Sequence, residues 1–159
     1  MSAPTAFDID LPDEAATAGL AQRLAERARR GDVIGLMGDL GSGKTTLARA
    51  FIRALGKGDE EVPSPTFTLV EVYGFPGHPP VWHFDLYRLT QPEQAYELGI
   101  EDAWSEGISL VEWPERLGPL LPAEHLLVAL AAGPRAQARL ARLSASAGWA
   151  PRVEGLGHG

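Results

Sequence analysis

Residues 33–45 read Val33-Ile34-Gly35-Leu36-Met37-Gly38-Asp39-Leu40-Gly41-Ser42-Gly43-Lys44-Thr45. The first five are almost wholly apolar, which is typical of a strand buried on both faces in a parallel sheet. The next eight fit the pattern G-x-x-x-x-G-K-[ST], which forms a phosphate-binding loop, or P-loop, between a strand and a helix. A glycine-rich turn with a chance lysine is the alternative, and the strand and helix context argues against it.

Each part of this motif suits a nucleotide phosphate. Glycines let backbone N–H groups approach the phosphate closely, and the N-terminus of the following helix adds a positive field. Lys44 is expected to neutralise the β- and γ-phosphate oxygens, and the Thr45 hydroxyl to ligate Mg²⁺. The sequence therefore predicts a nucleotide site formed by Gly38, Asp39, Leu40, Gly41, Ser42, Gly43, Lys44 and Thr45.

Helices and strands are expected on both sides of the motif. Apolar periodicity and capping residues predict helices over 13–30, 44–55 and 90–98. Apolar or β-branched runs predict strands over 66–73, 81–87, 108–111 and 126–131, of which the first two form an antiparallel hairpin. Residues 136–145 have helix propensity but would suit a strand beside 126–131, and we predict a strand. The fold class is therefore α/β, a small P-loop NTPase domain whose mostly parallel central sheet is flanked by helices and carries antiparallel hairpin additions.

Composition limits the protein classes that remain. The 159 residues suit one domain, which we predict over 1–149, with a flexible glycine-rich C-terminal tail over 150–159. A net charge of −7 disfavours direct binding of nucleic acid, and the absence of cysteine excludes disulfides and thiolate chemistry. The N-terminus lacks the pattern of a secretory signal and the longest apolar run, 126–132, is too short for a membrane helix. A cytoplasmic protein is the expectation.

Two acidic residues follow predicted strands, where a P-loop protein needs a carboxylate for Mg²⁺. Glu112 follows the more uniformly apolar strand, so we assign it to the metal ion. Asp85 follows the other strand and is the candidate for positioning the attacking water or completing the Mg²⁺ shell. The alternative for Asp85 is a plain ion pair with an arginine such as Arg88.

Other side chains have weaker signals. Thr66, in the stiff Ser64-Pro65-Thr66 segment, is a candidate sensor of the γ-phosphate, although a plain proline-rich turn explains the composition equally well. Trp113 either covers the nucleotide or belongs to the core. The four histidines show no metal-ligand spacing, and Arg135, Arg139 and Arg142 form either a lid or, more simply, a solvated face.

Five ordered segments resemble one known family. They are 38–46, Ser64-Pro65-Thr66-Phe67-Thr68-Leu69-Val70, His83-Phe84-Asp85-Leu86-Tyr87-Arg88-Leu89, Glu97-Leu98-Gly99-Ile100-Glu101-Asp102 and Val111-Glu112-Trp113-Pro114-Glu115. Their order and spacing resemble TsaE (also called YjeE), the bacterial ATPase of tRNA threonylcarbamoyladenosine (t6A) modification. The similarity extends over about residues 11–148. Five ordered segments are far more specific evidence than a P-loop alone.

This resemblance implies a function and a set of roles. It implies Mg²⁺-dependent ATP hydrolysis in support of t6A formation, together with TsaB and TsaD, with tRNA involved only through the complex. The implied phosphate-binding set includes Thr46, the metal ligands are Thr45 and Glu112, and the residues needed for hydrolysis are Lys44, Thr66 and Asp85. Trp113 would lie near the nucleotide, and Thr17 and Arg135 near the adenine. Pro134 interrupts the Gly-Arg turn that the family has at this place.

Two other functions use the same loop. A small-molecule kinase would need a second substrate pocket, for which the sequence shows no residues. A GTP-dependent switch usually reads guanine with Asn-Lys-x-Asp, and this chain contains no asparagine. A Mg²⁺-dependent ATPase is therefore the first hypothesis.

Overall fold

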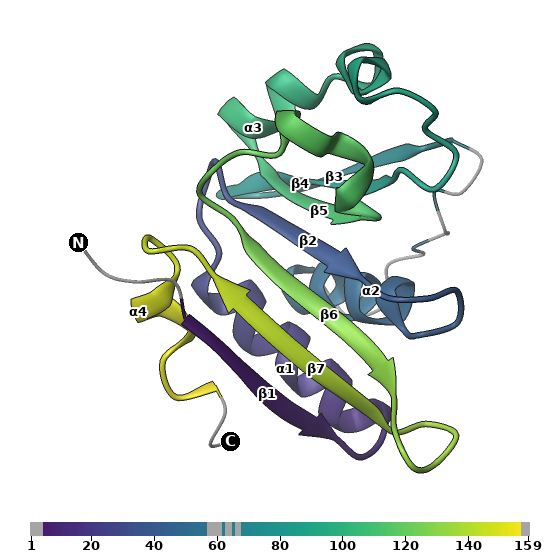
Figure 1. Ribbon diagram of the computed structural model, residues 1–159. Helices are drawn as coiled ribbons and strands as arrows, with labels where there is room; N and C mark the ends of the chain where they lie inside the picture. The colour runs from purple at the N-terminus through teal and green to yellow at the C-terminus, as the bar shows by residue number, and fades with distance from the viewer. Residues whose placement is uncertain (1–4, 57–61, 63–64, 66–67, 157–159) are drawn as a thin grey trace.

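The computed structural model describes residues 5–56, 62, 65 and 68–156, and within them a seven-stranded sheet organises the chain (Figure 1). The strands are β1 (Thr5–Leu11), β2 (Val33–Met37), β3 (Val70–Phe75), β4 (His78–Asp85), β5 (Ile108–Glu112), β6 (Leu126–Ala132) and β7 (Arg139–Ala145). The helices are α1 (Glu14–Arg27), α2 (Lys44–Leu55), α3 (Ile100–Glu106) and the short α4 (Ala150–Val153), with 3₁₀ segments η1 (Pro92–Leu98) and η2 (Pro114–Leu120).

The sheet is parallel at its centre and antiparallel at both edges. Its strand order is β1-β7-β6-β2-β5-β4-β3, in which β6, β2, β5 and β4 run parallel. The hairpin β3–β4 closes one edge and the antiparallel strands β7 and β1 close the other. The predicted α/β fold class with antiparallel additions is confirmed.

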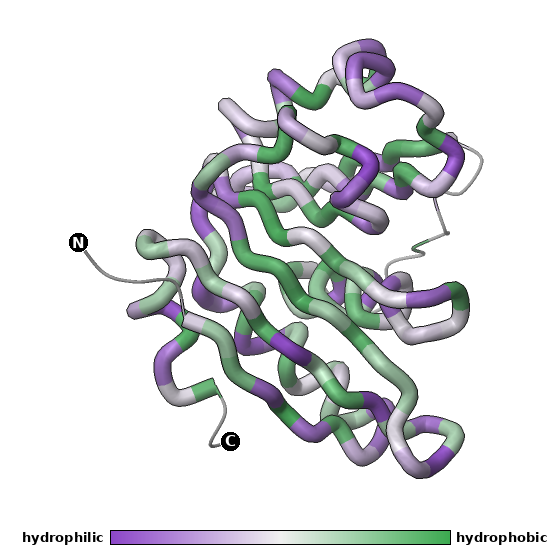
Figure 2. Tube along the Cα trace, in the orientation of Figure 1, coloured by the Kyte–Doolittle hydropathy of each residue, from purple (hydrophilic) through white to green (hydrophobic). Residues whose placement is uncertain are grey.

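Two apolar clusters cover the two faces of the sheet. The larger contains Leu20 and Leu24 of α1 and Phe51 of α2. These side chains belong to one cluster with residues of β1, β2, β4, β5, β6 and β7. The smaller joins η1, α3 and η2 to the other side of β2, β4 and β5. Figure 1 shows α1 and α2 behind the sheet, and Figure 2 shows β2 and β6 as strongly hydrophobic. The predicted strand over 33–37 is confirmed. Its successive side chains face opposite sides, because Val33 belongs to the smaller cluster and Ile34 and Leu36 to the larger.

The first strand, β1, is not among the elements predicted from the sequence. β1 pairs along its full length with β7, and its side chains alternate between the core and solvent. Ile9 and Leu11 are buried, whereas Asp8 and Asp10 between them are exposed. Apolar and polar residues alternate over 7–11 with a period of two, which is typical of a half-buried strand.

The C-terminal residues 150–156 differ from the predicted flexible tail. Ala150–Val153 forms α4, and Trp149, Val153 and Leu156 are all buried in the larger cluster. Arg152 also donates to the Asp32 carboxylate at 2.6 Å. The tail prediction is wrong for these residues. It rested on glycine content, but the apolar residues at 149, 153 and 156 have a spacing that lets them pack into the core. Residues 157–159 lie outside the described part.

No helix of the described residues combines the length and apolar character needed to cross a bilayer.

Candidate nucleotide-binding site

The loop between β2 and α2 has a backbone that depends on glycine. Gly43 precedes α2 with φ +104°, a left-handed conformation that residues with a Cβ rarely adopt. Gly38 has φ +139°, and a Cβ there would lie 2.5 Å from the carbonyl oxygen of Leu130 and from Ser42 Oγ. The first turn of α2 contains no acidic residue, so its exposed N–H groups keep their positive field. The predicted helix over 44–55 is confirmed, and its N-terminus opens at the loop.

Lys44 is held inside this loop. Its side chain is 5% exposed, and Nζ donates to the carbonyl oxygens of Gly38 at 2.5 Å and Asp39 at 2.9 Å. The ammonium also lies 4.3 Å from the centroid of the Trp113 ring, a cation–π contact. Burial lowers the pKa of Lys44 from its usual 10.5, and nearby carboxylates, Glu112 first, oppose that shift.

Glu112 ends β5 and faces the start of α2. The Thr45 hydroxyl donates to its carboxylate, at 2.9 Å to Oε1 and 3.1 Å to Oε2, and His83 Nε2 lies 2.7 Å from Oε2. Glu112 is only 2% exposed, so these partners replace the water that a carboxylate would otherwise bind.

Asp85 lies beside Glu112 on the neighbouring strand. The parallel register of β4 and β5 pairs Asp85 with Glu112, which places both acids at the same edge of the sheet as the loop. Asp85 is 6% exposed and its Oδ1 accepts the Tyr87 backbone N–H at 3.1 Å. Strand register therefore brings the two predicted acids together.

A pocket of about 220 Å³ collects these groups. This volume is below that of sites for whole drug-sized ligands, which exceed about 300 Å³, and suits the phosphate end of a nucleotide. The pocket is lined by Leu40, Gly41, Gly43, Lys44, Thr45, Thr46, Asp85, Glu112, Trp113 and Arg139. Most of the site residues predicted from the sequence thus meet at one place.

Arg139 is a site residue that the sequence analysis assigned to a lid or a solvated face. Its Nε donates to Ser42 O at 2.7 Å and its Nη2 to Gly41 O at 3.3 Å, so the guanidinium binds the outer side of the loop. Its Nη1 donates to the Ala136 and Ala138 carbonyls in the turn before β7. Arginine spacing contained no signal that separated Arg139 from its neighbours, because only the pairing of β6 with β7 brings it to the loop.

Two other predicted residues, Arg135 and Thr17, do not line this pocket. Arg135 is exposed in the turn between β6 and β7 and does not line the pocket, and Thr17 is buried on α1, where its hydroxyl donates to Asp13 O at 3.5 Å. Neither residue contacts the phosphate loop in any described interaction. Thr66 lies outside the described residues.

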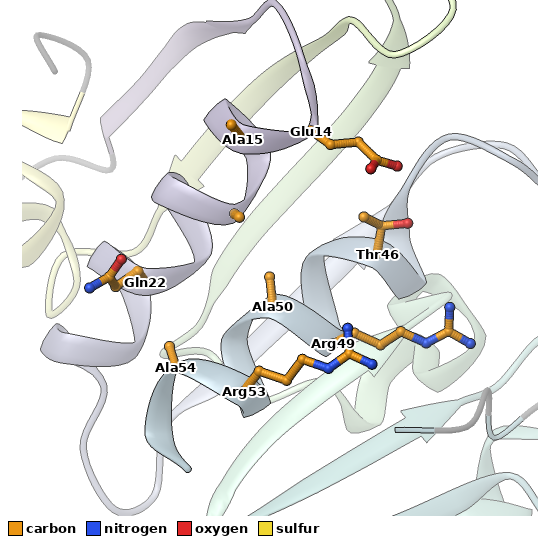
Figure 3. Close-up of a pocket in the computed structure, with 9 residues that line it drawn as sticks. Glu14, Ala15, Gln22, Thr46, Arg49, Ala50, Arg53 and Ala54 are labelled. Atoms are coloured by element: carbon orange, nitrogen blue, oxygen red, sulfur yellow. The ribbon is translucent and has the colours of Figure 1, made fainter. Parts of the chain in front are cut away.

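A second groove runs between α1 and α2 (Figure 3). It measures about 660 Å³ and is lined by Glu14, Ala15, Ala18, Gln22, Thr46, Arg49, Ala50, Arg53 and Ala54. In Figure 3, Glu14 extends from the start of α1 toward Thr46. Thr46 lines both this groove and the phosphate pocket, so the two spaces adjoin.

The oxygen donors at the pocket fit a nucleotide-bound Mg²⁺. Among the residues described, no group of three or more His, Cys, Asp or Glu side chains could hold a metal ion. Mg²⁺ usually binds through one or two protein oxygens together with substrate phosphates and water. The Thr45 hydroxyl and the Glu112 carboxylate, 2.9 Å apart beside Lys44, supply that partial set.

Comparisons with known proteins agree on one family. A family model described as "Threonylcarbamoyl adenosine biosynthesis protein TsaE" matches residues 11–140. The protein of Synechocystis sp. named "tRNA threonylcarbamoyladenosine biosynthesis protein TsaE" is 47% identical over 119 residues, covering 72% of this chain and 73% of that one. The Rickettsia bellii protein of the same name is 39% identical over 120 residues, covering 76% and 83%. The crystal structure of Bacillus subtilis YdiB superposes with a TM-score of 0.75 at 27% identity, covering 99% of this chain and 98% of that chain.

Proposed function

The chain belongs to the TsaE family of t6A biosynthesis, and from this premise we propose that it binds ATP with Mg²⁺ and hydrolyses it in concert with TsaB and TsaD. The observation that carries the proposal is the contact between Thr45 and Glu112, next to Lys44 at the N-terminus of α2. A fixed helix terminus, a lysine and a hydroxyl–carboxylate pair in one pocket match the parts that phosphoryl transfer requires. The expected compartment is the cytoplasm, where tRNA modification takes place.

Binding begins with the loop and Lys44. The backbone N–H groups at the start of α2 and the Lys44 ammonium receive the phosphate oxygens, and Lys44 then exchanges its loop carbonyls for stronger charged partners. Thr45 and Glu112 would hold Mg²⁺. The bound ion would neutralise charge on the β- and γ-phosphates. Thr46 lines both spaces, which supports a path for the ribose and base from the pocket toward the groove between α1 and α2.

Hydrolysis needs a water molecule in line with the bond between the β- and γ-phosphates. Asp85 lies at the pocket, level with Glu112, and accepts a hydrogen bond from that water, which orients its oxygen toward the γ-phosphorus. The new P–O bond forms as the bond to the β-phosphate oxygen breaks, so ADP leaves with the bond electrons and the protons of the water leave with the product phosphate. Trp113, half-buried against Lys44, shields this side of the pocket from bulk water.

The proposal includes partner proteins because the pocket of the isolated chain is shallow. Leu40 on its rim is 69% exposed, which leaves the phosphate face open to solvent. An added protein surface would exclude water and complete the charge stabilisation, as activating proteins do for other P-loop enzymes. We therefore expect slow turnover by the chain alone and faster turnover in the complex.

The test is phosphate release from ATP by the purified chain, with and without the TsaB–TsaD pair. We expect turnover well below about 1 per second alone and a clear increase with the pair, and Thr66→Ala to weaken that increase. Arg30→Ala is the matched control, because Arg30 donates only to Glu106 O far from the pocket in the described structure. Free turnover at about 10 per second or more, or no effect of the pair, would contradict a partner-gated ATPase and favour the small-molecule kinase.

A further inference from the structure

His83 is a fully buried polar side chain behind the candidate metal site. It lies on β4, where the register pairs it with Leu110, and its ring reaches forward to the end of β5. There Nε2 lies 2.7 Å from Glu112 Oε2. The same carboxylate accepts the Thr45 hydroxyl, so Glu112 is held between His83 and Thr45.

The proton on His83 follows from the chemistry of its partner. An ionised carboxylate only accepts hydrogen bonds, so a Glu112 that holds a cation requires the hydrogen on His83 Nε2. The other ring nitrogen, Nδ1, is buried and has no hydrogen-bond partner among the described residues. His83 therefore makes a single directed contact, and that contact is to Glu112.

A packing role alone does not account for a histidine here. Its ring is surrounded by the core, and burying a polar nitrogen without a partner costs free energy that leucine would not cost. The Nε2 contact offsets that cost, and it selects one orientation of the Glu112 carboxylate. Outer partners of this kind keep metal-binding carboxylates in place, and their loss typically lowers metal affinity about 10- to 100-fold.

We propose that His83 is a positioning residue that holds Glu112 in the orientation in which this carboxylate and Thr45 receive Mg²⁺. The inference rests on the proposed function, because it assigns His83 a role toward the metal ion of that site. His83 acts through Glu112 and does not itself touch the nucleotide. Its effect should therefore be on Mg²⁺-dependent binding, with nucleotide binding in the absence of the metal unaltered.

The experiment measures the Kd of a non-hydrolysable ATP analogue by calorimetry, once with Mg²⁺ and once with EDTA. The ratio of the two Kd values reports how strongly Mg²⁺ and nucleotide support each other. The informative pair is His83→Gln and His83→Asn, because a glutamine amide reaches the place of Nε2 whereas the shorter asparagine amide reaches only that of Nδ1. His125→Gln is the control, since that ring contacts Pro122 O and not the site.

We expect the Mg²⁺ ratio to fall about 10- to 100-fold in His83→Asn, to stay within about 3-fold of the wild type in His83→Gln, and to be unchanged in His125→Gln. The Kd in EDTA should be the same in all four proteins. Equal ratios for His83→Asn and the wild type, an equal loss in both amide variants, or a loss that is as large in EDTA would overturn the positioning role. Binding by the wild type that ignores Mg²⁺ would instead contradict the proposed function.

Discussion

Thr45 and Glu112 are 67 positions apart in the sequence, yet the Thr45 hydroxyl donates to Glu112 Oε1 at 2.9 Å. The contact joins the first turn of α2 to the last residue of β5, one strand away from the β2 strand that leads into the loop. The parallel order β2-β5-β4 explains it, because carboxyl ends of parallel strands meet at one edge. The phosphate-binding loop and the two acids thereby share one pocket. Three of the predictions below concern this pocket, and a fourth concerns the C-terminal segment at the other end of the sheet.

Replacing Lys44 with alanine should weaken nucleotide binding and leave the fold intact. The change removes the ammonium that would face the phosphates, and one charged hydrogen bond contributes about 1.5–3 kcal/mol, or about 10- to 150-fold in affinity. Calorimetric titration with ADP measures the loss, and circular dichroism checks the fold. Arg30→Ala removes an equal charge far from the pocket and should bind as the wild type does. ADP binding by Lys44→Ala at wild-type affinity would show that the phosphate site lies elsewhere.

The two acids should differ in the step that they affect. Glu112→Gln should reduce the Mg²⁺-dependent part of nucleotide affinity, because an amide is a poorer ligand for a hard cation. Asp85→Asn should leave the affinity nearly unchanged and lower turnover by about 100-fold or more, the range of a general base or water-orienting group. Binding and single-turnover assays on both variants separate the roles. If Asp85→Asn loses affinity and Glu112→Gln loses only rate, the two assignments are reversed.

Arg139→Ala should lower nucleotide affinity even though sequence spacing does not distinguish this arginine from its neighbours. The variant loses the donors to Ser42 O and Gly41 O, which hold the outer side of the loop. We expect about a 10-fold increase in the Kd for ADP, the effect of one charged hydrogen bond. Arg142→Ala is the matched control on the same strand, because Arg142 pairs with Asp8 on the exposed face. An identical Kd in the two variants would show that the loop does not need Arg139.

Leu156→Ala should destabilise the domain, because Leu156 belongs to the larger core cluster. Leu156 is 1% exposed, and removing a buried leucine side chain costs about 2–5 kcal/mol of unfolding free energy. Leu140→Ala, at a position 39% exposed on β7, should change the free energy by less than about 0.5 kcal/mol. Urea denaturation gives both values. Equal midpoints for Leu156→Ala and the wild type would restore the flexible-tail interpretation.

The structure of the P-loop motif and of the elements next to it could be predicted from short stretches of the sequence. The bounds of β2 and α2 follow from an apolar run, a loop that needs positive φ, and a glycine at position 56, all of which act within a few residues. Glu112 and Asp85 were also predictable, because each follows its own apolar run and parallel strands deliver their ends to one edge. The strand over 136–145 needed the topology as well, since propensity alone favoured a helix there.

Only the tertiary structure decided which residues complete the site. His83 has no metal-ligand spacing, and it meets Glu112 because β4 and β5 pair in one register, in which a shift of one residue would turn it to the opposite face. Arg139 and Arg135 look alike in the sequence, but β7 pairs with β6 so that Arg139 reaches the loop while Arg135 stays in the turn. Leu156 is buried because the segment after β7 packs into the larger cluster, where Arg23 of α1 donates to Leu156 O at 3.5 Å. Contacts of this kind depend on strand register and on packing between distant segments, and a local pattern does not encode them.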